Sequence, residues 1–418
     1  MKAQLLEKDV NVNYKWDLID SADPKLSDNI GWNKKPYYST FKPAVIKNEL
    51  FFVAREKRGM ITWMFNKLTD KWDFIDEFFP VFSDDLKWDN PEYYSTIKFF
   101  AFNDELYIMA REKRGMITWK FNFETKMWMR TPIDMFFPVF SDDSKWNKPE
   151  YYSTIQPVVV DKDLFLIARE HRGMLTFMFN KKTEKWNRTP IDEFFPVFSD
   201  DSKWNKPEYY STIKTAVVNK ELFLFARERR GMLTFMFDMK NKMWFRKPVD
   251  EFFPVFSDDK GWNKPEYYST IQTSVADNKL FMFARDQKGM LTFIFDMKNK
   301  KWDRVPYIKY GPELSDAQGW NKPEYYSTIK TFVKSNKIFL IAREHRGLMT
   351  WKLTKNKDVF AWELLDTFDP KFSDDKEWNK PEYYSTIKPV IFNNKVFMMA
   401  RDKSGILTFK FYKPVSVS

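Results

Sequence analysis

The chain has 418 residues, of which 43% are hydrophobic, so it can bury a large core. It contains no cysteine, which excludes disulfides, thiolate metal sites and a cysteine nucleophile. The net charge of +11 comes from Lys and Arg mixed with Asp and Glu throughout, whereas nucleic-acid binders more often gather their basic residues in one patch. We therefore expect no nucleic-acid partner.

The N-terminal residues 1–10 contain no apolar stretch of signal-peptide length. No apolar run in the chain approaches the roughly 18 residues that a transmembrane helix needs. These two features predict a protein that does not insert into membranes. We expect it to be cytoplasmic or exported by a leaderless route.

A single motif recurs along the whole chain, and at residues 204–213 it reads Trp-Asn-Lys-Pro-Glu-Tyr-Tyr-Ser-Thr-Ile. One step of 56 residues and five steps of 58 separate its leading tryptophans, which are Trp32, Trp88, Trp146, Trp204, Trp262, Trp320 and Trp378. A period of this length predicts a repeat architecture rather than two or three separate domains. We expect a tail over residues 1–13 and one repeat domain over residues 14–418.

In chain order, the first predicted strand covers residues 14–20 and contains Trp16. The repeat that follows can be described from the copy that begins at Tyr209. It predicts four strands, because short runs of β-branched and aromatic residues are bounded by turn residues, at 211–218, 222–227, 232–238 and 243–246. Tyr-Tyr-Ser-Thr-Ile is expected to open the first strand, and residues 248–265 form a long irregular connection to the next copy.

Glycine and arginine occupy fixed places in the repeat. Seven of the 11 glycines share one position, where a tight turn between the second and third strands favours positive φ: Gly59, Gly115, Gly173, Gly231, Gly289, Gly347 and Gly405. An arginine stands four residues earlier in every copy: Arg55, Arg111, Arg169, Arg227, Arg285, Arg343 and Arg401.

The strand pattern predicts an all-β fold, a seven-bladed β-propeller with four antiparallel strands per blade. Apolar residues fill both odd and even positions of the second and third strands, which indicates sheets covered on both faces. A tryptophan marks the fourth strand of six copies, at Trp72, Trp128, Trp186, Trp244, Trp302 and Trp362. The last repeat stops after its third strand, at Phe411, so we expect the strand with Trp16 to complete the last blade and close the ring.

The sequence offers no constellation typical of a catalytic centre. The only histidines, His171 and His345, share one repeat position that other copies fill with Lys, Arg or Gln, which indicates an exposed turn residue rather than a base. Adjacent carboxylates such as Asp200 and Asp201 lack a calcium-loop pattern and suit loop capping. No nucleophile-elbow, P-loop or zinc-protease motif is present. We expect no catalysis, no cofactor and no metal.

The irregular loop holds the best candidates for a repeated binding site. A tryptophan in a polar loop is costly unless it packs or binds, its flat face suits a sugar ring, and neighbouring Glu and Arg can bond to hydroxyls. The candidate tryptophans are Trp88, Trp146, Trp204, Trp262, Trp320 and Trp378. The candidate glutamates are Glu92, Glu150, Glu208, Glu266, Glu324 and Glu382. The candidate arginines are Arg111, Arg169, Arg227, Arg285, Arg343 and Arg401.

Each candidate also has a structural interpretation. The loop tryptophan can pack as a wedge across the junction of two blades, and the tyrosine pair can pack in the core. The arginine can form an inter-blade salt bridge with Glu or Asp. The first copy has Lys35 and Pro36 in place of Pro-Glu, so we expect its site to be weaker or absent.

The run Leu222-Phe-Leu-Phe-Ala-Arg-x-x-x-Gly-x-Leu, followed by an aromatic strand and a tryptophan, resembles the blades of seven-bladed β-propeller lectins of the PLL-like bacterial group. It is more distantly similar to tachylectin-type propeller lectins. The resemblance covers all seven repeats and implies glycan sites on or between blades, with fucose and O-methylated sugars as ligands of the related group. This chain departs from that group by its long Phe-Phe-Pro-Val-Phe-Ser-Asp-Asp…Trp-Asn-Lys-Pro-Glu insertion, so the sugar identity does not carry over.

We therefore expect a multivalent carbohydrate-binding protein whose partners are glycans or glycoconjugates. A repeated site implies low affinity at each copy multiplied by valency. The alternative is a protein-interaction or structural propeller that uses the same aromatic loops. The sequence leaves open whether rings pair through their faces as a homo-oligomer.

Overall fold

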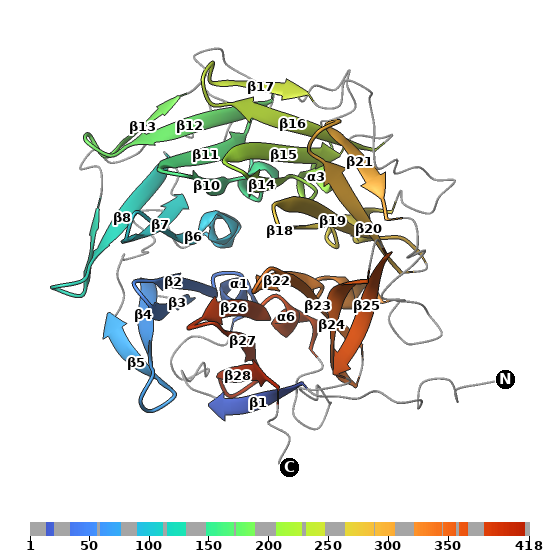
Figure 1. The fold of residues 1–418 in the computed structure, drawn as a ribbon. Helices are drawn as coiled ribbons and strands as arrows, with labels where there is room; N and C mark the ends of the chain where they lie inside the picture. The colour runs from blue at the N-terminus through green and yellow to red at the C-terminus, as the bar shows by residue number, and fades with distance from the viewer. Residues whose placement is uncertain are drawn as a thin grey trace.

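The structure is a computed structural model of the whole chain. The residues that it describes are 14–20, 34–56, 59–76, 90–111, 115–130, 148–170, 173–188, 206–227, 231–246, 264–287, 289–305, 322–344, 346–356, 359–366 and 380–413. Seven four-stranded antiparallel sheets are arranged around a central axis, as Figure 1 shows. This architecture is the seven-bladed propeller that the repeat predicts.

Each blade runs from an innermost strand at the axis to an outermost strand at the rim. Blade one contains β2 (Lys42–Ile46), β3 (Glu49–Glu56), β4 (Gly59–Asn66) and β5 (Lys71–Asp76). Blade two contains β6 (Lys98–Phe102), β7 (Glu105–Arg111), β8 (Met116–Asn122) and β9 (Met127–Arg130). Blade three contains β10 (Gln156–Val160), β11 (Asp163–Arg169), β12 (Met174–Asn180) and β13 (Lys185–Arg188). Blade four contains β14 (Lys214–Val218), β15 (Glu221–Arg227), β16 (Met232–Asp238) and β17 (Met243–Arg246).

The remaining blades repeat the pattern, with one variation in blade six, where the outer hairpin is longer. Blade five contains β18 (Gln272–Ala276), β19 (Lys279–Arg285), β20 (Met290–Asp296) and β21 (Lys301–Arg304). Blade six contains β22 (Lys330–Lys334), β23 (Lys337–Glu344), β24 (Gly347–Asn356) and β25 (Val359–Asp366). Blade seven contains β26 (Lys388–Phe392), β27 (Lys395–Arg401), β28 (Ile406–Tyr412) and the N-terminal strand β1 (Lys15–Asp20).

The N-terminal strand closes the ring, as predicted. β1 pairs antiparallel with β28, and Trp16 lies opposite Phe411 in the register. The indole of Trp16 is 3% exposed and its ring centroid lies 4.8 Å from that of Phe411. Blade seven therefore joins the two ends of the described chain in one sheet, and no blade is left with three strands.

The hydrophobic core lies between neighbouring blades, because each sheet is apolar on both faces. One cluster, for example, joins Phe51 and Val53 of β3 to Leu106 and Ile108 of β7. In β15, every residue from Leu222 to Arg227 is buried. The core is thus a set of layers between blades rather than a single central mass, and each blade depends on its neighbours for burial.

Two-residue turns connect the first and second strands of the blades. In blade one, Lys47 and Asn48 have φ of 48° and 59°, and in blade five Asp277 and Asn278 have φ of 48° and 56°. Two successive positive φ angles define the type I′ turn, whose twist suits a β-hairpin and which Asn and Asp tolerate well. The polar break predicted after the first strand is therefore a tight hairpin turn.

A ring of hydrogen bonds ties the outermost strand of each blade to the preceding blade. In each case a tryptophan indole N–H donates to a threonine hydroxyl on the third strand of the preceding blade. The pairs are Trp72–Thr408 (2.9 Å), Trp128–Thr62 (3.0 Å), Trp186–Thr118 (3.4 Å), Trp244–Thr176 (2.9 Å), Trp302–Thr234 (2.8 Å), Trp362–Thr292 (3.4 Å) and Trp16–Thr350 (3.0 Å). The tryptophan of the outermost strand therefore links each blade to the preceding one.

Replacing Trp244 with Phe removes one such bond and leaves the buried hydroxyl of Thr176 without it. We expect the free energy of unfolding to fall by about 1–2 kcal/mol, since an unsatisfied buried polar group costs about that much. Denaturant titration measures the change. The matched control is Phe245→Leu, at an exposed position of the same strand, β17. An unchanged midpoint for Trp244→Phe would show that the bond contributes nothing.

The prediction for the start of each blade was wrong in one respect. The Tyr-Tyr pair does not open the first strand; in blade four it lies in a short helix, α3 (Pro207–Tyr210), and the strand begins only at Lys214. Proline suits the first helical position because its missing N–H has no helical acceptor there, and Lys206 before it is extended. The Ser-Thr-Ile segment forms the turn that links this helix to the strand.

Candidate functional site

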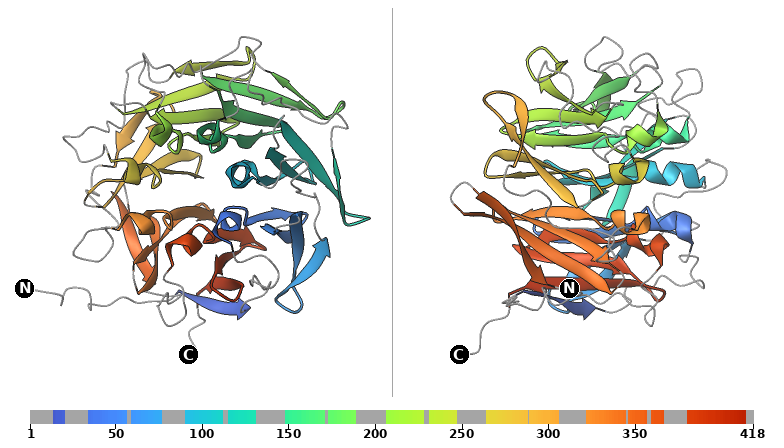
Figure 2. Two further views of the ribbon diagram at one scale, coloured as in Figure 1. Left: turned by 180° about the vertical axis from the view of Figure 1, so that it is seen from behind. Right: turned by 90° about the vertical axis from the view of Figure 1, so that its right-hand side faces the viewer.

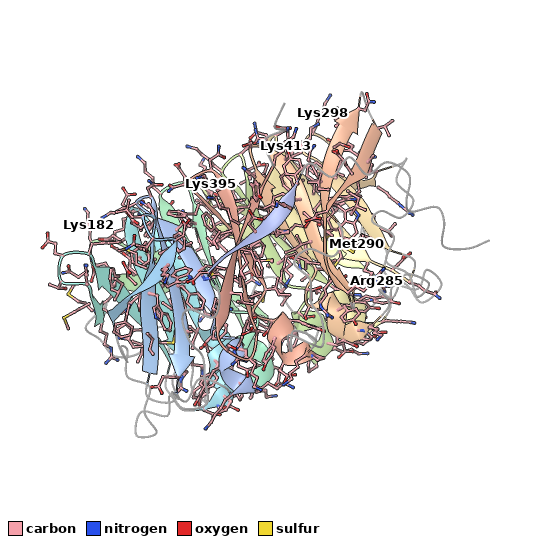
Figure 3. All side chains as sticks on the ribbon, turned by 90° about the horizontal axis from the view of Figure 1, so that it is seen from below. Lys182, Arg285, Met290, Lys298, Lys395 and Lys413 are labelled. Atoms are coloured by element: carbon pink, nitrogen blue, oxygen red, sulfur yellow. The ribbon has the colours of Figure 1, made fainter. Side chains whose placement is uncertain are left out.

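Seven short helices surround the axis on one face of the propeller (Figure 2). One precedes the innermost strand of each blade: α1 (Lys35–Tyr38), η2 (Pro91–Thr96), α2 (Pro149–Tyr152), α3, α4 (Pro265–Tyr268), α5 (Pro323–Tyr326) and α6 (Pro381–Tyr384). Each of them buries both of its tyrosines. Figure 3 shows Arg285 toward this helical face, whereas Lys298 and Lys395 lie at the opposite face.

These tyrosines explain why every copy of the repeat has an arginine at the same position. The guanidinium of Arg227 lies 4.7 Å from the ring centroid of Tyr209 in its own blade and 4.5 Å from that of Tyr268 in the next blade. The two rings also contact each other, with centroids 5.8 Å apart. A desolvated cation between two aromatic faces is a favourable arrangement, and arginine suits it because its charge is planar and delocalised.

The same contact occurs at all seven junctions, and we call it the Tyr–Arg ladder. Its arginines lie between Tyr37 and Tyr94 (Arg55), Tyr93 and Tyr152 (Arg111), Tyr151 and Tyr210 (Arg169), Tyr209 and Tyr268 (Arg227), Tyr267 and Tyr326 (Arg285), Tyr325 and Tyr384 (Arg343), and Tyr383 and Tyr38 (Arg401). Three of them also donate to the tyrosine hydroxyl of the next blade, as in Arg285–Tyr326 at 2.8 Å.

The threonine of the repeat locks each helix to its own blade. In blade four, the hydroxyl of Thr212 donates to the carbonyl of Tyr209 at 2.6 Å and accepts the backbone N–H of Arg227 at 3.0 Å. Equivalent bonds occur in the other six blades. One hydroxyl therefore fixes the helix and the end of the second strand together, which makes the helical face a rigid platform.

The six candidate arginines, with Arg55, have no exposed surface. They lie between tyrosines of adjacent blades. The inter-blade salt bridge with Glu or Asp and the glycan contact that the sequence predicts for them both stay predictions. The tyrosine partners were not identified from the sequence as partners of the arginine. A constant spacing of 18 residues, from Tyr209 to Arg227 for example, was the available signal.

The six candidate glutamates lie in the first turn of their helices. Glu324 is exposed, and Glu92, Glu150, Glu208, Glu266 and Glu382 are partly exposed. The carboxylate of Glu92 accepts the side-chain amide of Asn90 at 2.9 Å. The glutamates therefore project from a rigid element at the surface, where they can accept hydrogen bonds from a ligand.

The candidate tryptophans of the loops, with His171, His345 and the Asp200–Asp201 pair, lie outside the described residues. The predicted role of the tryptophans in stacking on a sugar thus stays a prediction. Among the residues that the structure describes, no group of three or more His, Asp or Glu is arranged to hold a metal ion. No helix within the described ranges is long and apolar enough to span a membrane.

A pocket of about 350 Å³ lies between blades five and six, at the face opposite the short helices. Phe281 and Phe360 form part of its wall, with ring centroids 5.8 Å apart, and Lys352 and Lys355 also line it. It occurs beside the long outer hairpin of blade six, β24 and β25. It is not part of the repeated helical face.

No protein-family model matches this sequence, and no curated protein sequence does so at a significant level. The structure is similar to that of the polysaccharide lyase Uly1, with a TM-score of 0.55, 11% identity and 90% of each chain covered. YCF48 from Cyanidioschyzon merolae gives 0.47 at 11% identity, covering 95% of this chain and 99% of that one. The propeller domain of the trilobed protease from Pyrococcus furiosus gives 0.41 at 11% identity, covering 79% and 85%.

None of these three proteins is named as a lectin. At 11% identity the likeness to Uly1 shows the fold alone. The resemblance to propeller lectins is therefore supported at the level of architecture: the chain is a seven-bladed β-propeller built of repeated blades.

Proposed function

We propose that this propeller is a multivalent, non-catalytic glycan-binding protein whose sites are repeated on the helical face. The observation that carries the proposal is the ring of seven short helices, each held to its blade by the hydrogen bonds of the repeat threonine. Six of the seven helices present a glutamate at the surface directly after the tryptophan-bearing loop. A catalytic centre uses a single constellation, whereas here the same polar group recurs in nearly every blade.

In this proposal the three residue types have separate roles. Tryptophans such as Trp204 stack on the sugar, and glutamates such as Glu208 accept hydrogen bonds from its hydroxyls. The arginines hold the helices in place through the Tyr–Arg ladder, since their side chains are fully buried. Each copy binds weakly, and a surface that carries many glycans is held by several copies at once.

A glycan array followed by haemagglutination with sugar competition tests this function. We expect array signals, and agglutination that free sugar inhibits. Stepwise replacement of Trp88, Trp146, Trp204, Trp262, Trp320 and Trp378 by Ala should reduce agglutination steeply with each removed copy, by about tenfold or more for the first few, because avidity multiplies single-site affinities. Free-sugar capacity, measured by calorimetry, should fall only in proportion to the copies removed.

The matched control replaces Phe245, an exposed aromatic residue of β17 on the outer rim, with Ala. Agglutination should be unchanged in this variant. A blank array together with capture of a defined protein partner would overturn the glycan proposal in favour of the protein-interaction propeller. Loss of thermal stability in Trp204→Ala without loss of glycan binding would make the loop tryptophan a structural wedge.

A further inference from the structure

The innermost strands carry an unusual set of charges at one level of the central channel. The first residue of each innermost strand is a lysine in five blades and a glutamine in two: Lys42, Lys98, Gln156, Lys214, Gln272, Lys330 and Lys388. All seven stand at the same place in the repeat, shortly after the short helix, and all are partly buried. The seven innermost strands surround the axis (Figure 1), so these residues form one ring near the helical end of the channel.

The five lysines converge on the axis rather than on separate blade interfaces. Lys330 in blade six interacts electrostatically with Lys214 in blade four and Lys42 in blade one, and neither of those blades is adjacent to it. Lys388 likewise interacts with Lys98, two blades away, as well as with Lys42 and Lys330. Side chains directed between two blades would sense only their immediate neighbours.

Burial and mutual repulsion both disfavour the charged form of these lysines. Burial, followed by the charges of Lys42 and Lys214, lowers the pKa of Lys98 to about 7 from 10.5. Burial, followed by Lys214 and Lys42, lowers the pKa of Lys330 to about 8. Within the described ranges, none of the five lysines forms an ion pair with a carboxylate. Among the described residues, the charged groups that lower these pKa values are other lysines of the ring.

Packing does not require lysine at this position. Gln156 and Gln272 occupy it in two blades, and Gln156 is held by the neighbouring blade, with its amide donating to the carbonyl of Ile213 at 2.8 Å and accepting from Thr215 at 3.2 Å. A neutral side chain of similar length thus fits the same fold. Like charges gathered where a neutral residue fits create a strong positive potential that attracts an anion.

We propose that the lysine ring binds one compact, multiply charged oxyanion of the phosphate class on the propeller axis. Each ammonium group offers three donors, and phosphate oxygens are strong acceptors, so several lysines can bond to one anion. A monovalent ion would neutralise a small part of the ring, whereas a polyphosphate chain supplies charge comparable to that of the five lysines. The site uses none of the residues of the proposed glycan sites.

Isothermal titration calorimetry with sodium tripolyphosphate, at low ionic strength and pH 7, tests the site. We expect one anion per chain, since there is one axis, and weaker binding of inorganic sulfate. The variant Lys98→Gln/Lys388→Gln introduces the residue that blades three and five already carry. We expect it to lose affinity by about tenfold or more, because it removes two of the five lysines whose charged form a bound anion would favour. The control Lys71→Gln/Lys298→Gln removes the same charge from exposed outer positions and should bind as the parent does.

Stability without the anion supplies a second readout. The lowered pKa values mean that, between about pH 7 and 10.5, the unfolded chain holds more protons than the folded chain, so stability rises with pH through this window. The double Gln variant should be more stable than the parent at pH 7 and should gain less toward pH 10. Tripolyphosphate should raise the melting temperature of the parent and of the control, and raise that of the double variant less.

Binding of several anions per chain, or equal loss of affinity in the control, would show general attraction to a basic protein and would overturn the proposal. So would a double variant that binds as the parent does. A double variant that is less stable than the parent at pH 7 without anion would make the lysines structural and would likewise refute it.

Discussion

Removal of residues 1–20 is expected to lower the free energy of unfolding by about 5 kcal/mol or more. The deletion removes β1, whose Trp16 is nearly fully buried and bonded to Thr350 of blade six. Loss of a buried tryptophan alone costs about 3–5 kcal/mol, and each lost strand hydrogen bond adds about 0.5–1.5 kcal/mol. Denaturant titration and thermal melting measure the change.

The deletion also leaves β28 as an open sheet edge. The partners of β1 there include Phe409 and Phe411, so the exposed edge combines free backbone groups with aromatic side chains. Such edges pair with other chains, and we expect concentration-dependent aggregation of the truncated protein. A variant that lacks only residues 1–13 keeps β1 and should melt as the parent does. A chain without residues 1–20 that melts at the parent temperature and stays monomeric would contradict closure by β1.

Replacement of Arg227 with Ala is expected to destabilise the protein by about 3–5 kcal/mol. The substitution leaves a cavity and removes the cation between Tyr209 and Tyr268, a contact worth about 2 kcal/mol or more when desolvated. Because the two tyrosines belong to adjacent blades, the loss falls on the junction between blades four and five. Chemical denaturation and the near-ultraviolet circular dichroism of the tyrosines report it.

Two further substitutions separate charge from volume. Arg227→Met fills much of the space without a cation, and Arg227→Lys keeps the charge without the planar group that stacks on a ring. We expect both to be less stable than the parent and more stable than Arg227→Ala. The control Lys71→Ala removes an exposed basic side chain from β5 and should change stability by less than about 0.5 kcal/mol. If Arg227→Met is as stable as the parent, the guanidinium contributes to stability only through its volume.

Much of the fold could be predicted because the relevant signals are local and repeated. The third and fourth strands of blade four were placed at 232–238 and 243–246, which are their observed bounds. The spare tryptophan, Trp16, identified the missing strand of the last blade. In both cases a short pattern, compared across seven copies, was sufficient.

The start of each blade was misread because Ser-Thr-Ile has strand-like composition, while Pro207 before Tyr-Tyr is a helix-start signal. The Tyr–Arg ladder depends on contacts between blades, so its partners lie about 40 residues apart in sequence, as Arg285 and Tyr326 do at a separation of 41. The lysine ring is visible in the sequence only as Lys after Ile in four copies and after Phe41 in the first copy. Closure of the ring is what brings those residues face to face.

The Tyr–Arg ladder also bears on why the molecule has seven blades. Blades are wedges, and the angle between two of them is set where they come closest, near the axis, by the size of the side chains between them. Tyr, Arg and Tyr fill all seven junctions, with facing tyrosine rings 5.5–5.9 Å apart throughout. Each junction therefore turns the chain by one-seventh of a circle. A chain shortened by one repeat would have to widen every remaining junction before its ends could meet, so the ladder favours a ring of seven blades.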